Sequence, residues 1–168
     1  MMQDLYYFIR RIRPSIVVET VTHTGDTSEA ILRALDKNAH GTLLTLTDTR
    51  DVEELFKKSG AWDVFLHDSE HDVGCMTFEL ELAWRLVKPC GYILADDYTW
   101  GTPEHYAWPD FLKRHGLEAE EPLGPIACAQ KPMHGPKPPK TVDELAGIID
   151  KCVELSAAAK ILYDGSQT

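Results

Sequence analysis

Acidic side chains follow two apolar segments of this sequence, and they are its clearest candidates for chemistry. Asp68 comes two residues after the run 63–66, whereas Asp96 and Asp97 directly follow the run 92–95. Carboxylates gathered in one place repel each other, and burying them without a partner is costly. A divalent cation such as Mg²⁺, Mn²⁺ or Ca²⁺ removes this repulsion because it prefers oxygen ligands. We therefore predict that Asp68, Asp96 and Asp97 bind a divalent metal; the alternative is that these acids begin the next helices and face water.

The elements that must bring these acids together are strands that alternate with helices. Strands are expected over residues 15–19, 42–46, 63–66, 92–95, 117–119 and 126–129. Helices are expected over residues 5–13, 29–35, 51–58 and 141–163, and around residues 111–112. Ser28 is expected to be the N-cap of the helix over residues 29–35. A further long helix is expected after residue 71, with an apolar stripe that ends at Val87. This alternation predicts an α/β fold with a Rossmann-like, mainly parallel sheet and helices on both faces. Ligands of such sheets bind beyond the carboxyl ends of the strands, where the predicted metal ligands stand.

Length, charge and cysteine content restrict the kind of protein. A chain of 168 residues suits one domain: a Rossmann-like part, residues 1–130, and a Pro-rich linker with a final helix, residues 131–168, within the same unit. The net charge of −10 argues against nucleic acid as a partner, since phosphate binding needs clustered Lys and Arg. No apolar run approaches the length of a membrane span, and no signal peptide is visible. Four widely spaced cysteines give neither a zinc nor a disulfide pattern, so we expect a reduced, cytoplasmic protein.

Residues 16–131 resemble the class I S-adenosylmethionine-dependent methyltransferases, in particular their small metal-dependent, catechol O-methyltransferase-like branch and its cephalosporin-hydroxylase-like relatives. Three segments, residues 17–28, 63–71 and 86–97, carry the resemblance, and their order and spacing are specific only when taken together. The resemblance implies methyl transfer from S-adenosylmethionine to a hydroxyl group of a small molecule, assisted by a divalent metal.

The resemblance also implies roles for individual residues. Glu19, Gly25 and Ser28 match the loop that wraps the methionine part of the methyl donor, where a glycine lets backbone amides approach the ligand. The residues implied to bind S-adenosylmethionine are Glu19, Thr22, Gly25, Ser28 and Asp48. The predicted metal acids match the metal ligands of the family. His71, three residues after Asp68, stands where catechol-type enzymes have a basic residue that takes the proton of the acceptor hydroxyl; its alternative role is to cap a helix or support the metal.

Several positions depart from the family pattern. Val21 stands where the first loop usually has a glycine, so its side chain is expected to intrude on the methyl donor or to block a positive φ. Asp48 lies one residue beyond the usual ribose-binding acid, and Cys90 replaces the first residue of a usual glycine pair. Only 14 residues separate Asp48 from Asp63, so one edge strand of the family's sheet is expected to be missing. The exposed edge is a place where a second copy of the chain could pair.

Two other functions stay open at this point. The chain could have lost the methyl donor and act as a binding or assembly module, which Val21 and the shortened segment favour. It could also keep the metal without the donor, as a hydrolase that uses a metal-activated water. Tyr98, Trp100 and Trp108 follow the last acids, and they either form a wall for a flat acceptor or pack within the protein.

Overall fold

A five-stranded sheet forms the centre of the protein, with its strands in the order β2-β1-β3-β4-β5. The computed structural model describes residues 2–21, 24–48, 51–70, 72–96 and 104–166. Strands β1 to β4 run parallel, and β5 is antiparallel to β4. The strands are β1 (Ile16–Thr20), β2 (Thr42–Leu46), β3 (Trp62–His67), β4 (Val87–Ala95) and β5 (Ala127–Gln130). The predicted Rossmann-like, mainly parallel sheet is confirmed.

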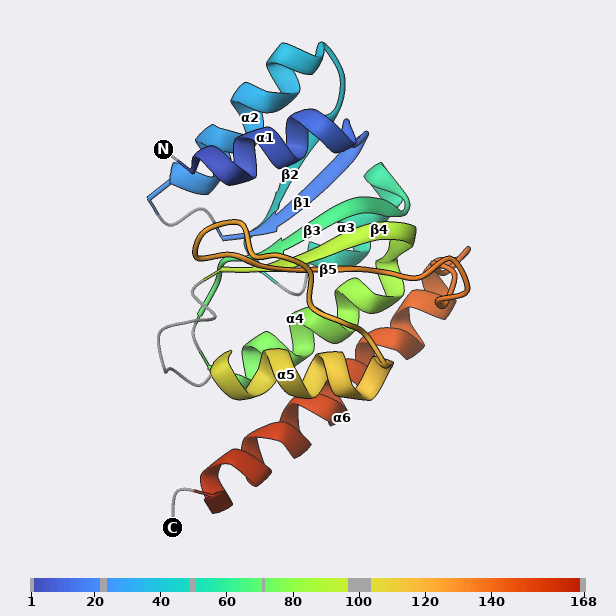
Figure 1. Ribbon diagram of the computed structural model, residues 1–168. Coiled ribbons are helices and arrows are strands. Elements are labelled where there is room, and N and C mark those ends of the chain that lie inside the picture. Colours follow the sequence, from blue (N-terminus) through green and yellow to red (C-terminus); the bar gives the residue numbers. More distant parts are fainter. Residues whose placement is uncertain (1, 22–23, 49–50, 71, 97–103, 167–168) are drawn as a thin grey trace.

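Helices cover both faces of this sheet (Figure 1). The helices are α1 (Gln3–Ile12), α2 (Asp26–Asn38), α3 (Val52–Ser59), α4 (Val73–Leu86), α5 (Glu104–His115) and α6 (Val142–Ser166). Helices α1 and α2 lie on one face, and α3 to α6 lie on the other, where they enclose the larger of two apolar clusters. The longest helix, α6, has 25 residues and packs against α4. Among the described parts of the chain, none of the helices has both the length and the apolar character that crossing a membrane requires.

The central strand β3 is buried on both of its faces. Val64 and Leu66 join the apolar cluster beneath α1 and α2, whereas Phe65 belongs to the cluster on the α4 side. This alternation follows from the two-residue period of a strand, and a strand covered on both faces has a continuous apolar run. Because the strand ends at His67, Asp68 is delivered to the carboxyl edge of the sheet.

Lys131 is a fully buried cation at the C-terminus of α4. Its Nζ donates hydrogen bonds to the carbonyl oxygens of Trp84 (2.5 Å) and Val87 (2.6 Å), and it lies 5.2 Å from the centre of the Trp84 ring. The last carbonyls of a helix have no partner within it, and a donor there satisfies them. Burial, and then the nearby charge of Arg85, lower the pKa of Lys131 to about 8. The first residue of the Pro-rich segment is thus anchored on α4.

Three local expectations from the sequence are wrong. Helix α2 begins directly after Gly25, which is its N-cap with a φ of 83°, so Ser28 lies inside the helix instead of capping it. Val87 begins β4 and does not end the helical stripe, because its backbone is already extended. Residues 117–119 form no strand; they belong to the connection between α5 and β5. In each case the residue pattern was too short to distinguish the end of a helix or strand from its interior.

Strand β2 forms one edge of the sheet and pairs only with β1 among the described strands. Between Asp51 and β3 the described chain forms α3 and no further strand, in agreement with the expected loss of an edge strand. The sequence of β2, Thr-Leu-Leu-Thr-Leu, contains neither charge nor proline, the features that commonly protect sheet edges from pairing. Helix α3 beside it carries acids in its first turn and bases in its last.

Candidate active site

A cleft opens at the carboxyl ends of β1, β3 and β4, where the sequence places the candidate ligands. Its volume is about 790 Å³. The described residues that line it are Met2, Val21, Thr24, Asp26, Thr27, Asp68, Ser69, Glu70, Asp96 and Pro125. Most of them follow a strand or begin α2, so segments far apart in the sequence meet at one edge of the sheet. This is the position at which parallel α/β sheets bind their ligands.

Asp68 and Asp96 lie in this cleft, and their charges interact. The Asp68 amide donates to Thr20 Oγ1 (3.1 Å), and the Asp96 amide donates to the last carbonyl of β3 (3.0 Å), so backbone bonds hold both acids. Burial, and then the carboxylates of Asp96 and Glu19, raise the pKa of Asp68 to about 6. A hydrogen bond from Thr27 Oγ1 to Asp68 Oδ2 (2.8 Å) offsets this rise only in part. The cleft therefore concentrates negative charge that a cation would stabilise.

A complete metal site needs more donors than the described residues bring together. No group of three His, Cys, Asp or Glu side chains in the described ranges is arranged to hold a metal. Asp68 and Asp96 supply two carboxylates. The third predicted ligand, Asp97, and the predicted base, His71, lie outside the described residues. The metal ligands and the base thus stay predictions.

Glu19 is a buried carboxylate at the end of β1, and among the described residues only one of its oxygens has a hydrogen-bond partner. Ser28 Oγ donates a hydrogen bond to Glu19 Oε2. Glu19 Oε1 is buried and has no hydrogen-bond partner among the described residues. Leaving a carboxylate oxygen buried without a donor is costly, so the protein gains stability when a ligand supplies an N–H group there. The orphaned oxygen points to a ligand that carries an ammonium or amide donor.

The first turn of α2 forms one wall of the cleft, whose described lining residues do not include the fully buried Glu19. Gly25, at a φ of 83°, turns the chain into this helix, and Thr24, Asp26 and Thr27 around it line the cleft. The first amides of a helix have no partner within it, and the helix dipole places positive potential there. A ligand with a carboxylate can bind such amides. Glu19 and this terminus together suit the zwitterionic end of an amino acid.

Val21 adopts the backbone conformation that a glycine would take at its position. Its φ is 52°, a left-handed value that is rare for a β-branched residue, and its amide donates to the carbonyl of Leu46 (3.1 Å). Cys90, the other replacement of a usual glycine, has a φ of 66°. The expectation that Val21 would block a positive φ is therefore wrong. The side chain of Val21 does line the cleft, so the expected intrusion on a ligand stays a prediction.

The other predicted residues take different places. Thr22 lies outside the described residues. Asp48 stands two residues beyond the end of β2 and is not among the described residues that line the cleft. Trp108 is buried in α5 beside Phe111, with ring centres 5.8 Å apart, so it packs in the core and forms no acceptor wall. The structure thus brings together Glu19, Gly25, Ser28, Asp68 and Asp96.

Sequence reasoning missed three residues that shape this site. Thr20 and Thr27 each hold Asp68 by a hydrogen bond. Glu79, in the middle of α4, receives hydrogen bonds from residues on both sides of Asp68. The only sequence signal for Glu79 is a carboxylate in an otherwise apolar helical stretch, because such a residue needs buried partners.

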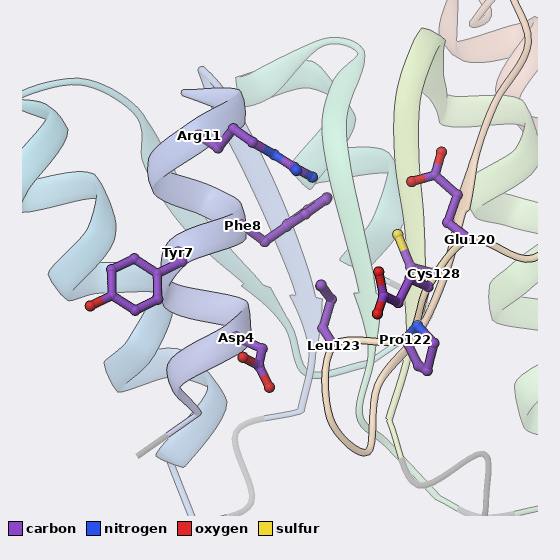
Figure 2. Close-up of a pocket in the computed structure, with 9 residues that line it drawn as sticks. Asp4, Tyr7, Phe8, Arg11, Glu120, Pro122, Leu123 and Cys128 are labelled. Atoms are coloured by element: carbon purple, nitrogen blue, oxygen red, sulfur yellow. The ribbon is translucent and has the colours of Figure 1, made fainter.

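A second hollow lies between α1 and the segment before β5 (Figure 2), with a volume of about 550 Å³. Its described lining is Asp4, Tyr7, Phe8, Arg11, Glu120, Glu121, Pro122, Leu123 and Cys128. None of these is a predicted site residue. Burial raises the pKa of the Cys128 thiol to about 12, which leaves it protonated and a poor nucleophile at neutral pH. The cleft at the carboxyl edge is therefore the stronger candidate.

The strand order, the helices on both faces and the cleft at the carboxyl edge define a Rossmann-like α/β fold. No protein-family model and no curated protein sequence matches the chain. Among solved structures, the S-adenosylhomocysteine-bound methyltransferase PaMTH1 from Podospora anserina matches with a TM-score of 0.56 at 12% identity, over 77% of this chain and 77% of that chain. The O-methyltransferase TomG from Streptomyces achromogenes, solved with S-adenosylmethionine, matches with a TM-score of 0.55 at 11% identity, over 78% of this chain and 79% of that chain. At these identities the similarity shows a shared fold.

Proposed function

We propose that the protein transfers a methyl group from S-adenosylmethionine to a hydroxyl group of a small molecule, in the manner of the catechol O-methyltransferase-like branch. The observation that carries the proposal is the buried oxygen of Glu19, which has no hydrogen-bond partner in the described part of the chain and lies next to Ser28 of the α2 helix. The amino-acid end of S-adenosylmethionine presents an ammonium and a carboxylate, which match the Glu19 oxygen and the free amides of α2. The solved structures that share the fold include complexes with this donor and its demethylated product.

The proposed roles follow the positions of the residues. Glu19 accepts the donor's ammonium, Ser28 holds the Glu19 carboxylate in place, and Gly25 lets the chain turn so that the α2 amides face the carboxylate. Thr22 and Asp48 complete the contacts to the donor in this proposal, with Asp48 reaching the ribose hydroxyls. Holding donor and acceptor together in one orientation supplies much of the rate acceleration in reactions of this kind.

A divalent metal held by Asp68, Asp96 and Asp97 belongs to the same proposal. Asp68 and Asp96 supply two of the carboxylates that a hard cation prefers, and the charge of Asp96 adds to the effect of burial in raising the pKa of Asp68 to about 6. A bound metal would lower the pKa of a hydroxyl that it coordinates. In this proposal His71 is the base that accepts the proton of the acceptor hydroxyl at an imidazole nitrogen.

Calorimetric titration with S-adenosylmethionine, with and without Mg²⁺, tests the proposal. We expect micromolar binding by the wild type, and a loss of roughly 10- to 100-fold in affinity for Glu19→Gln, as removal of a charged hydrogen bond predicts. Glu29→Gln is the control, since Glu29 lies in the first turn of α2, directly after Ser28, and pairs with exposed Arg33 at 3.3 Å. Equal affinities for Glu19→Gln and Glu29→Gln would contradict the assignment of Glu19. Absence of donor binding with metal binding retained would favour the binding module or the hydrolase instead.

A second copy of the chain at the outer edge of β2 is also part of this proposal. The edge lacks protective charges, and a two-fold axis there would set two α3 helices antiparallel. Glu53 and Glu54 at the start of one α3 would then face Lys57 and Lys58 at the end of the other, so the helix is complementary to its own copy. The oligomeric state in solution tests this part of the proposal.

A further inference from the structure

Glu79 is a charged residue in the middle of the most deeply buried helix, α4. Only 4% of its surface is exposed, and the residues around it on the helix are mostly apolar. A buried carboxylate is tolerated only when hydrogen bonds replace its hydration. The partners of Glu79 therefore decide what it does.

Both oxygens of Glu79 accept hydrogen bonds. His67 Nδ1 (2.6 Å) and Thr20 Oγ1 (2.8 Å) bind Oε2, and Ser69 Oγ binds Oε1 at 2.8 Å. Cys75 Sγ lies 3.6 Å from Oε1 as a weaker donor. Burial alone would raise the pKa of Glu79, but the bonds from His67, Ser69 and Thr20 outweigh it and lower the pKa below its ordinary value. Glu79 is thus an ionised acceptor, and Nδ1 of His67 carries the proton.

These partners surround Asp68 in the chain. His67 directly precedes Asp68, Ser69 directly follows it, and the Thr20 hydroxyl that donates to Glu79 accepts the amide of Asp68 at 3.1 Å. We propose that Glu79 is the positioning residue of the cleft: by holding His67, Ser69 and Thr20 it fixes the backbone that presents Asp68. The structural part of this inference stands on the hydrogen bonds alone, and its consequence for ligand binding rests on the proposed function.

His67 strengthens the inference because Glu79 is the only hydrogen-bond partner of its ring among the described residues. Its ring is fully buried, and Nε2 has no hydrogen-bond partner among the described residues. Removal of the Glu79 charge would weaken the bond at Nδ1 and leave the imidazole held by packing only. Since His67 is the last residue of β3, its movement is passed directly to Asp68.

Glu81 provides a matched control on the same helix. It is 5% exposed, and it is bound by Arg114 Nε and by His115 Nε2, both at 3.0 Å. Those partners belong to α5, so Glu81 joins α4 to α5 and forms no hydrogen bond with the described residues that line the cleft. Glu79→Gln and Glu81→Gln remove the same charge from two buried positions, and only the first should affect Asp68.

Amide hydrogen exchange measured by NMR tests the inference without any ligand. The quantity compared is the ratio of the exchange rate of the Asp68 amide to that of the core amide of Val64 in the same protein. In Glu79→Gln we expect this ratio to be about tenfold higher than in the wild type, as loss of about one charged hydrogen bond predicts. In Glu81→Gln that ratio should not change. Ser69→Ala removes one of the hydrogen bonds to Glu79 and keeps the acceptor of the Asp68 amide, so it should give part of the effect if Glu79→Gln folds poorly. Equal ratios in all variants and the wild type would overturn the inference.

Mn²⁺ titration then separates positioning from general structural support. We expect Glu79→Gln to weaken Mn²⁺ binding by roughly 10- to 100-fold and Glu81→Gln to leave it unchanged. Equal losses in the two variants would contradict an action through Asp68. If the wild type binds no Mn²⁺, the metal part of the proposed function fails, while the exchange ratios still decide the role of Glu79.

Discussion

Replacing Val21 by glycine tests whether the first loop is strained at the position that the family fills with glycine. Val21 has a φ of 52° and lines the cleft with its side chain. A left-handed conformation costs a residue with a Cβ about 1–2 kcal/mol, whereas glycine adopts it freely. Glycine gains conformational entropy in the unfolded chain, which offsets about 0.5–1 kcal/mol of that benefit. The half-buried valine side chain contributes on the order of 1 kcal/mol, so the stability of Val21→Gly should stay close to that of the wild type.

Val21→Ala separates conformation from side-chain size. At an ordinary backbone position alanine is more stable than glycine by about 0.5–1 kcal/mol. At a φ of 52° the order should reverse, with Val21→Gly more stable than Val21→Ala by about 0.5–1 kcal/mol. Urea unfolding followed by tryptophan fluorescence resolves this difference. An alanine variant as stable as the glycine variant, or more stable, would refute the strain at this position.

The affinity of the same two variants for S-adenosylmethionine tests whether the Val21 side chain obstructs the methyl donor. If the valine side chain obstructs the donor, both variants should bind it more tightly than the wild type, and Val21→Gly should bind it most tightly. Calorimetric titration measures the change. No gain in either variant would indicate that the shortened segment after Asp48 limits donor binding instead.

Three further outcomes are expected. Asp68→Ala should abolish Mg²⁺ or Mn²⁺ binding while circular dichroism shows the fold retained; an unchanged titration would rule out Asp68 as a ligand. Lys131 has a pKa of about 8 in the folded protein and an ordinary value of 10.5 in the unfolded chain. Between these two pH values the unfolded chain holds more protons than the folded protein, so the free energy of unfolding rises with pH, by up to roughly 3 kcal/mol. Lys131→Met should lose that rise, and parallel urea-unfolding curves for variant and wild type across this pH range would contradict the buried cation. Thr45→Lys on β2 should lower the mass found by light scattering from dimer to monomer, whereas Val153→Lys on exposed α6 should leave the mass unchanged. An unchanged mass in Thr45→Lys would exclude pairing at this edge.

The sequence predicted those parts of the fold in which the pattern is local. Buried strands show continuous apolar runs, so the end of β3, and with it the position of Asp68, could be predicted directly. The missing edge strand was predicted from the family resemblance, because the 14 residues between Asp48 and Asp63 are too few for the elements that the family has there. The carboxyl-edge location of Asp96 required only the topology of a parallel sheet.

The parts that could not be predicted depend on contacts between distant segments. Glu79 has partners 10, 12 and 59 residues away, and no local pattern connects them. Ser28 looked like a helix cap because its type favours that position, but its hydroxyl instead binds Glu19 from inside the helix. The positive φ of Val21 contradicts the preference of its residue type, and only the surrounding turn fixes it.

The C-terminal segment holds α4 at both ends. Lys131 binds the last carbonyls of this helix, and at its other end Ser156 Oγ donates to the carbonyl of Gly74 (2.7 Å) and Lys160 lies 3.5 Å from Asp72. The Pro-rich connection between these two anchors could therefore be cut without separating the pieces. A chain divided within residues 135–140 should reassemble from its two fragments, and the split protein would recover the cleft only when the C-terminal fragment is supplied.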